Sequence, residues 1–190
     1  MLRRLVLVVA LAACSSFDLG PPTNIDDACS IIRQKPEWFF EMRNVERRWQ
    51  LPTSVQMAIL WQESKFQQRA KTPRKKLFGF IPWKRQSSAY GYAQVIDGTW
   101  DWYREQTGKR FASRSDFGDA VEFMGWYSDI TTKKYGIAKS DVRNQYLAYH
   151  QGHAGFGDKS YLGEPWLIKV ADNLVDRERM YRNQLEGCRP

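Results

Sequence analysis

The chain has 190 residues, of which 43% are hydrophobic and 14% aromatic, with only 13 glycines and 8 prolines. This composition excludes a disordered or collagen-like chain, and the length predicts one compact domain with short appendages. The formal net charge of +8 favours anionic partners such as nucleic acid, phospholipid or an acidic polymer, although charge alone does not choose among them.

The first fourteen residues are typical of an export signal. Two arginines precede an apolar run over residues 5–13, which is too short to cross a bilayer as a helix, and Cys14 follows directly. Leu11-Ala12-Ala13-Cys14 resembles the lipobox of bacterial lipoproteins. The resemblance implies a signal peptide over 1–13, a lipid on Cys14 and, from Ser15, sorting to the periplasmic face of the outer membrane. The alternative is an ordinary export signal followed by a chance cysteine.

Export changes which partners are relevant. An exported protein rarely meets DNA, so nucleic acid is not expected, whereas phospholipid headgroups and the peptidoglycan wall remain. Cys29 and Cys188 are the cysteines left after lipidation. Because an even count in an oxidising compartment is typical of disulfide pairing, we expect one bridge between the two ends of the domain.

Residues 14–23 contain serine, glycine and paired prolines and predict a lipidated tether, so the folded domain is expected over 24–190. Asn24 with Asp27 predicts the cap and the first-turn acid of an initial helix. Strand-type alternation is scarce, which predicts a mainly α fold in a single domain. Further helices are expected over 36–50, from Pro52 or Thr53 to 61, and over 97–106, 115–135, 140–151 and 164–185, the last four with a glycine near their ends.

An unusual insertion over residues 69–85 carries seven lysines and arginines and no acid, interleaved with Phe78, Phe80, Ile81 and Trp83. In one interpretation this loop grips an anionic surface, either a membrane interface or a sugar groove. In the other it is a solvated basic loop whose aromatic side chains pack back on the domain. Both interpretations remain open at this point.

Glu63 is the first candidate for chemistry. Helical spacing places it on one face with Val55, Ile59 and Phe66. A carboxyl on such an apolar stripe loses hydration, which raises its pKa toward the range useful for a general acid near neutrality. The alternative is a glutamate at a helix end that turns outward or caps a neighbouring backbone group.

Three short motifs occur in order along the chain and resemble those of the lytic transglycosylases. The family's E-S pair is matched by Glu63 and Ser64, its G-L-M-Q by Gly91 and Gln94 around Tyr92 and Ala93, and its A-Y-N by Ala148, Tyr149 and His150. The resemblance covers roughly residues 51–155. It implies the helical lysozyme-like fold that these enzymes share with goose-type lysozymes, and cleavage of peptidoglycan glycan strands.

Carried over by position, the resemblance makes Glu63 the catalytic acid and then base, oriented by a hydrogen bond from the Tyr149 hydroxyl. It also implies that substrate is bound by Ser64, Gly91, Tyr92, Gln94 and His150. His150 replaces the family's asparagine, and the alternative is a partly buried histidine at a helix end. A metal site at His150 and His153 lacks an evident third ligand, so no metal is expected.

The resemblance implies cleavage after N-acetylmuramic acid with closure of a 1,6-anhydro ring, and it requires no cofactor. Muramidase hydrolysis on the same scaffold is an alternative, with Asp97 or Asp101 as the second acid that most glycoside hydrolases need. A further alternative is a peptidoglycan-binding lipoprotein without turnover. A third interpretation makes the basic segment 69–85 a membrane or assembly contact.

Overall fold

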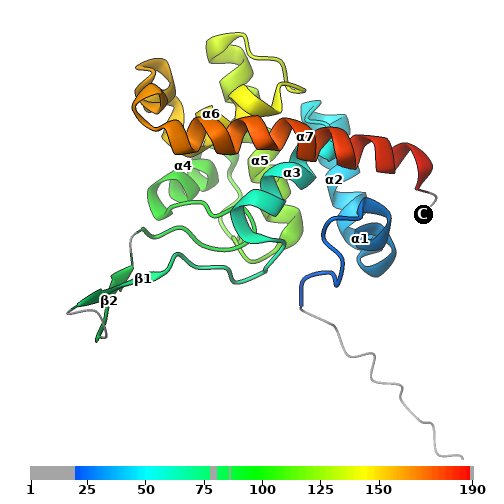
Figure 1. Ribbon diagram of the computed structural model, residues 1–190, viewed down its shortest axis with the longest axis horizontal. Helices are drawn as coiled ribbons and strands as arrows, with labels where there is room; N and C mark the ends of the chain where they lie inside the picture. Colours follow the sequence, from blue (N-terminus) through cyan, green and yellow to red (C-terminus); the bar gives the residue numbers. More distant parts are fainter. Residues whose placement is uncertain (1–19, 78–80, 86, 189–190) are drawn as a thin grey trace, which may run out of the picture.

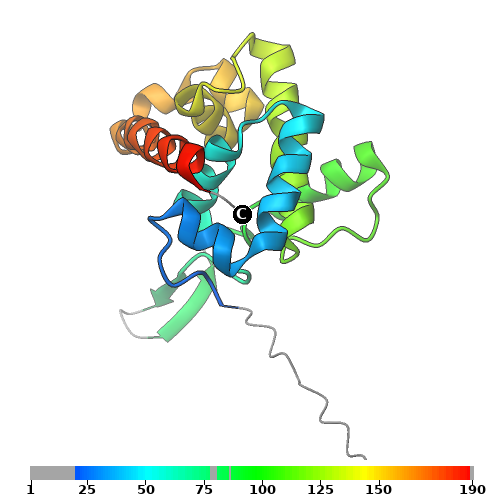
Figure 2. The same ribbon diagram turned by 90° about the vertical axis from the view of Figure 1, so that its right-hand side faces the viewer.

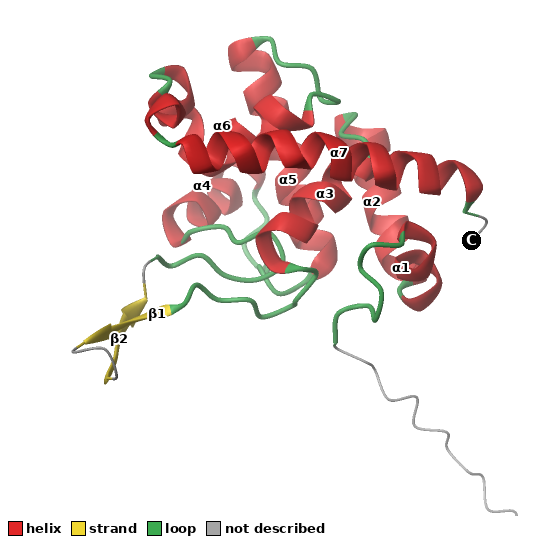
Figure 3. Ribbon diagram, viewed as in Figure 1, coloured by secondary structure: helices red, strands yellow, loops and turns green. Residues whose placement is uncertain are grey.

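The computed structural model describes residues 20–77, 81–85 and 87–188, and within them the chain is mainly helical, as predicted (Figures 1 and 3). The predicted signal peptide and lipidated Cys14 lie outside the described residues. The helices are α1 (Ala28–Gln34), α2 (Pro36–Trp49), α3 (Thr53–Ser64), α4 (Asp97–Thr107), α5 (Phe117–Tyr135), α6 (Val142–Gly157) and α7 (Pro165–Gly187), with a short 3-10 helix at Ser160–Gly163. Among them no helix combines the length and apolar character needed to cross a membrane.

Helix α3 runs through the core. Every residue from 53 to 60 is buried, and the polar side chains among them, Thr53, Ser54 and Gln56, form hydrogen bonds within the protein. The long helix α7 packs against α3 and α6, while α2 packs against α5 (Figure 1). This arrangement fixes the end of α3, where Glu63 lies, against α6.

The N-terminal part of the domain begins earlier than expected. Pro22 is buried, and the Thr23 backbone N–H donates to the Gln34 side chain at 3.0 Å. The expected cap at Asn24 is wrong, because its side chain accepts a hydrogen bond from the nearby Asp26 N–H. Asp27 caps α1 instead, accepting from the first backbone N–H groups of the helix.

The expected disulfide between Cys29 and Cys188 is present, with the two Cα atoms 5.3 Å apart. It joins α1 to the residue that follows α7. Gln184 strengthens the same junction, since its side chain accepts from the Ala28 N–H at 2.8 Å and donates to the Asp26 carbonyl at 3.1 Å.

The basic insertion forms a β-hairpin, not an irregular loop. Strand β1 (Arg74–Leu77) pairs with β2 (Ile81–Arg85) antiparallel, with Arg74 opposite Arg85 and Leu77 opposite Ile81. The run Arg74-Lys75-Lys76 has no alternation of apolar and polar residues, so this part of the sequence does not indicate a strand. The hairpin projects from the helical body in both views (Figures 1 and 2). Phe78 and Phe80 lie outside the described residues.

Helix α6 continues beyond its predicted end near Gly152. This glycine interrupts the helix with φ 73° and ψ 161°, and helical residues resume on its far side as far as Gly157. Such a conformation suits glycine because it has no Cβ. The kink lies two residues after the end of the A-Y-H motif.

Candidate active site

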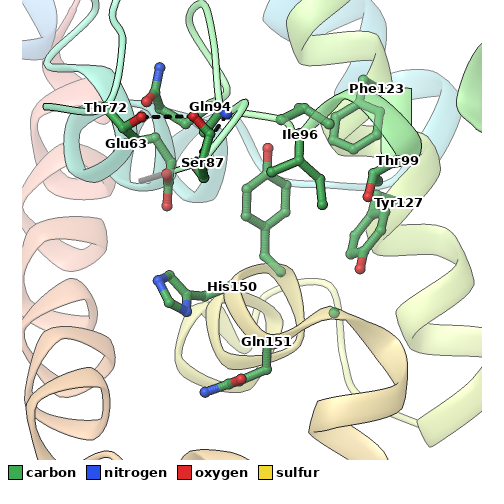
Figure 4. Close-up of a pocket in the computed structure, with 14 residues that line it drawn as sticks. Glu63, Thr72, Ser87, Gln94, Ile96, Thr99, Phe123, Tyr127, His150 and Gln151 are labelled. Carbon is green, nitrogen blue, oxygen red and sulfur yellow. Dashed lines mark hydrogen bonds between the residues drawn. The ribbon is translucent and has the colours of Figure 1, made fainter. Parts of the chain in front are cut away.

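A cleft of about 410 Å³ opens between α3, the segments at the base of the hairpin, and the helices α4, α5 and α6 (Figure 4). Of the residues predicted for the site, the cleft is lined by Glu63, Gln94, Tyr149 and His150. In Figure 4 Glu63 and Gln94 are drawn on one side of the cleft and His150 on the opposite side. The ordered motifs of the sequence therefore meet around one cavity.

Glu63 lies in the last turn of α3, which ends where Lys65 adopts a left-handed conformation. Burial raises the pKa of the Glu63 carboxyl from 4.5 to about 7, as the apolar stripe of Val55 and Ile59 predicts. A hydrogen bond from Tyr146 and the charge of Lys65 oppose this rise without cancelling it. Near neutral pH the carboxyl is therefore able both to give and to take a proton.

Tyr146 is the residue that sequence reasoning missed. It is 2% exposed, and its hydroxyl hydrogen-bonds the Glu63 carboxylate from α6. Tyr146 and Tyr149 are three residues apart on one helix and so share a face. Since Tyr149 belongs to a site motif, the three-residue spacing is the sequence signal that indicates a place for Tyr146 on the same side of the helix.

Tyr149 makes a different contact from the expected one. Its hydroxyl donates to the carbonyl of Ala93 at 2.6 Å, while its ring packs against Phe123 and Tyr127 with centroids 6.1 and 5.6 Å away. The predicted hydrogen bond to Glu63 is thus made by Tyr146, one helical turn earlier. Tyr149 instead ties α6 to the loop that carries Gln94.

The second motif is a tight loop that presents Gln94. The Gln94 side-chain amide donates to the carbonyls of Ala70 at 2.9 Å and Gly91 at 2.8 Å. Gly91 has φ +80°, and a Cβ there would lie 2.0 Å from the Arg114 carbonyl oxygen. A side chain at Gly91 would therefore collide with the protein's own backbone.

Neither candidate for a second carboxylate lines the cleft. Asp97 pairs with Arg114 at 2.7 Å, and Asp101 pairs with Arg104 at 3.0 Å. Both aspartates line a separate surface depression beside α4. Within the described ranges, Glu63 is the carboxyl group that lines this cleft.

A family model described as a transglycosylase SLT domain matches residues 2–188. The chain belongs to this family. It is accordingly a lytic transglycosylase, a lyase that acts on peptidoglycan. Comparisons with curated proteins and with solved structures gave no match.

Two motif residues of the transglycosylase do not reach the cleft. The Ser64 hydroxyl donates back to the Leu60 carbonyl at 3.2 Å and is buried. Tyr92 is also buried, with its ring packed against Trp38 and Phe117 at 5.4 and 5.2 Å. The Ser64 hydroxyl and the Tyr92 ring are therefore engaged within the protein, and substrate contact by these two residues stays a prediction.

His150 does line the transglycosylase's cleft, and its ring meets the half-exposed Trp166 edge to face at 5.3 Å. Burial lowers the pKa of His150, although the charge of Glu164 opposes this shift. His153 stacks on Tyr127 at 4.2 Å and does not line the cleft. Among the described residues no group of three or more histidines, cysteines or acids is placed to hold a metal ion.

Proposed function

We propose that Glu63 is the catalytic acid and then the catalytic base of this transglycosylase, and that the product carries a 1,6-anhydro-N-acetylmuramic acid end. As an acid, Glu63 protonates the glycosidic oxygen while the bond from that oxygen to the muramic acid anomeric carbon breaks. The sugar's own N-acetyl group stabilises the positive charge on that carbon. As a carboxylate, Glu63 then removes the proton of the C6 hydroxyl, whose oxygen bonds to the anomeric carbon.

One observation carries this proposal, namely that the carboxyl lining the cleft has a pKa of about 7. A group that must be protonated in the first step and ionised in the second works best when its pKa lies near the working pH. Burial supplies the shift, and the neutral Tyr146 hydroxyl holds the carboxyl in place.

Direct hydrolysis is disfavoured by the same geometry. Most enzymes that hydrolyse glycosides need two carboxyl groups, one for the leaving group and one to activate water or attack the sugar. Asp97 and Asp101 are each held in an ion pair outside the cleft. A reaction in which the substrate supplies its own nucleophile, the C6 hydroxyl, needs only Glu63.

The test is mass spectrometry of the fragments released from purified peptidoglycan by the protein and by its Glu63→Gln variant. We expect anhydromuramic ends that vanish in the variant. Reducing ends would mean hydrolysis. Undiminished release by Glu63→Gln would refute the assignment of the acid, and wall binding without any release would favour a binding protein.

We also propose that the chain is a lipoprotein of the outer membrane, facing the periplasm, with the signal peptide 1–13 removed and Cys14 lipidated. The lipobox-like tetrad and the position of Ser15 support this, and the Cys29–Cys188 disulfide is compatible with an oxidising compartment. Membrane fractionation tests it: Cys14→Ser should release the protein from membranes, and Ser15→Asp should retain it at the inner membrane. An unmodified N-terminal cysteine in the mature protein would contradict it.

A further inference from the structure

The base of the hairpin is part of the catalytic cleft. Thr72 and Ser87, which flank the two strands, both line the cavity that contains Glu63 (Figure 4). The Thr72 hydroxyl donates to the Ser87 carbonyl at 3.0 Å, and an antiparallel bridge joins Lys71 to Tyr90 beneath it. The segments that lead into and out of the hairpin therefore form part of one cleft wall.

This wall carries positive charge without compensation. The sequence has no aspartate or glutamate between Glu63 and Asp97. Arg69, Lys71 and Arg74 are all exposed, and none of the three forms an ion pair with another described residue. Lys71 lies over the ring of Tyr90, with its Nζ 5.4 Å from the ring centroid, which is a contact that leaves its charge unneutralised.

The register of the hairpin adds to this excess. Arg74 lies directly opposite Arg85 across the two strands. By contrast, the charge of the nearby Arg114 is neutralised, because its guanidinium forms an ion pair with Asp97 at 2.7 Å.

We propose that the cations at the base of the hairpin bind the carboxylates of the peptide stems carried by a glycan strand lying in the cleft. The inference rests on the proposed function and names a determinant of specificity for it. The sugars themselves offer little negative charge, whereas the peptides attached to muramic acid carry free carboxylates. A strand that passes Thr72 and Ser87 brings its stems alongside Arg69, Lys71 and Arg74.

Continuity with the cleft favours this ligand over a phospholipid surface. Arg69, Lys71 and Arg74 do not line the cleft themselves, but each lies within three residues of Thr72, which does, so their charges stand beside the channel where the stems of a bound strand would emerge. Guanidinium and ammonium groups are suited to carboxylates, and Arg69 and Arg74 are able to bind them in a two-pronged geometry.

The experiment compares two substrates and two variants of the full-length protein, purified in detergent. The substrates are glycan chains bearing their peptide stems and the same chains after an amidase has removed the stems. One variant combines Arg69→Gln, Lys71→Gln and Arg74→Gln. The matched control combines Arg47→Gln, Lys134→Gln and Lys169→Gln, which remove three exposed cations of α2, α5 and α7 outside the cleft.

We expect the hairpin variant to lose about tenfold in kcat/KM on stem-bearing chains, as three modest surface interactions would give. Its turnover of stem-free chains should match that of the unaltered protein, which also shows that it folds. The control should keep both rates. High salt should reduce the advantage of stem-bearing chains in the unaltered protein and leave the hairpin variant unaffected.

Equal losses on both substrates, or an unchanged preference for stems, would overturn the inference. Loss of binding to anionic phospholipid vesicles with an unchanged stem preference would assign the hairpin to the membrane instead. Failure of the proposed function is distinguishable, because it would appear as Glu63→Gln retaining turnover of stem-free chains.

Discussion

The Tyr146 hydroxyl donates a hydrogen bond to the Glu63 carboxylate and so links the middle of α6 to the end of α3. The two helices contact each other; Tyr146 is buried, and Glu63 lies beside it in the wall of the cleft. Burial raises the pKa of Glu63 and this hydrogen bond lowers it, so the value near 7 is a balance between the two. The acid strength of Glu63, the proposed catalytic acid, therefore depends on a residue outside the family motifs.

Replacing Tyr146 by phenylalanine should move the pH dependence of the reaction. The hydrogen bond favours the ionised carboxylate. Its loss should therefore raise the pKa of Glu63 above its present value of about 7. Activity that needs the protonated acid falls above about pH 7 in the unaltered protein, and in Tyr146→Phe this fall should occur roughly one pH unit higher. The measurement is kcat/KM against pH, which reports the free enzyme.

Two other tyrosines serve as controls for this prediction. Tyr149→Phe removes the hydrogen bond to the Ala93 carbonyl, so it should lower the rate by loosening the loop of Gln94 while the pH midpoint stays in place. Tyr161→Phe, in the short 3-10 helix, should change neither quantity. If Tyr149→Phe moves the midpoint and Tyr146→Phe does not, the two roles are reversed.

Glu63 should make the protein less stable as pH rises. Its pKa is about 7 in the folded protein and 4.5 without burial, so the folded state binds more protons between these values. The stabilising contribution of the protonated carboxyl is complete below pH 4.5 and is lost as pH rises through 7. Glu63→Gln removes the part of the pH dependence of stability that Glu63 causes. At pH 8 the unfolding free energy of the variant should exceed that of the unaltered protein by up to about 3 kcal/mol.

Urea unfolding at pH 4 and pH 8 checks this expectation. The stability difference between Glu63→Gln and the unaltered protein should be small at the lower pH and large at the higher one. Glu105→Gln in α4 is a suitable control because Glu105 is exposed, so the variant removes an acid that is not buried. A difference that is the same at both pH values would contradict the raised pKa.

The parts of this structure that follow from local spacing could be predicted from the sequence. Helical periodicity located α2 to α7 to within a few residues, apart from the kink at Gly152 that extends α6. The apolar stripe marked Glu63, and cysteine counting gave the disulfide. Each of these depends on neighbours along the chain or on a count, and none requires knowledge of how helices pack.

The parts that failed depend on contacts between distant segments. Tyr146 reaches Glu63 only because α6 lies against α3. Tyr92 is an aromatic in a substrate motif, and whether such a ring faces the cleft or the core is decided by Trp38 and Phe117. The hairpin depends on cross-strand register, which a run of basic residues does not reveal.

Gly91→Ala should be strongly destabilising. The alanine Cβ would lie 2.0 Å from the Arg114 carbonyl oxygen, so one of the two backbone segments must move. The alanine would also have to adopt φ +80°, which is strained for a residue with a side chain. We expect a loss of at least about 2 kcal/mol in unfolding free energy and weaker presentation of Gln94 in the cleft. Gly98→Ala is the matched control, because it has nothing within 4 Å of its Cβ and lies in the first turn of α4. Equal thermal stability of the two variants would show that the loop yields at little cost.

The disulfide should matter for stability more than for catalysis. Cys29 and Cys188 close a loop of 159 residues, which in the chain-entropy account stabilises by about 4 to 5 kcal/mol at most. Because Gln184 bridges the same junction through its side chain, the double variant Cys29→Ala and Cys188→Ala should keep the fold at 25 °C. Its melting temperature should fall clearly, while its activity below the transition stays close to that of the unaltered protein.

Gln184→Ala alone should reduce the unfolding free energy by less, since it removes hydrogen bonds at the edge of the domain and leaves the disulfide in place. If the double variant melts at the same temperature as the unaltered protein, the disulfide adds no stability beyond the contacts between α1 and α7. If activity is lost well below the melting temperature, the junction of α1 and α7 also positions Glu63 through α3.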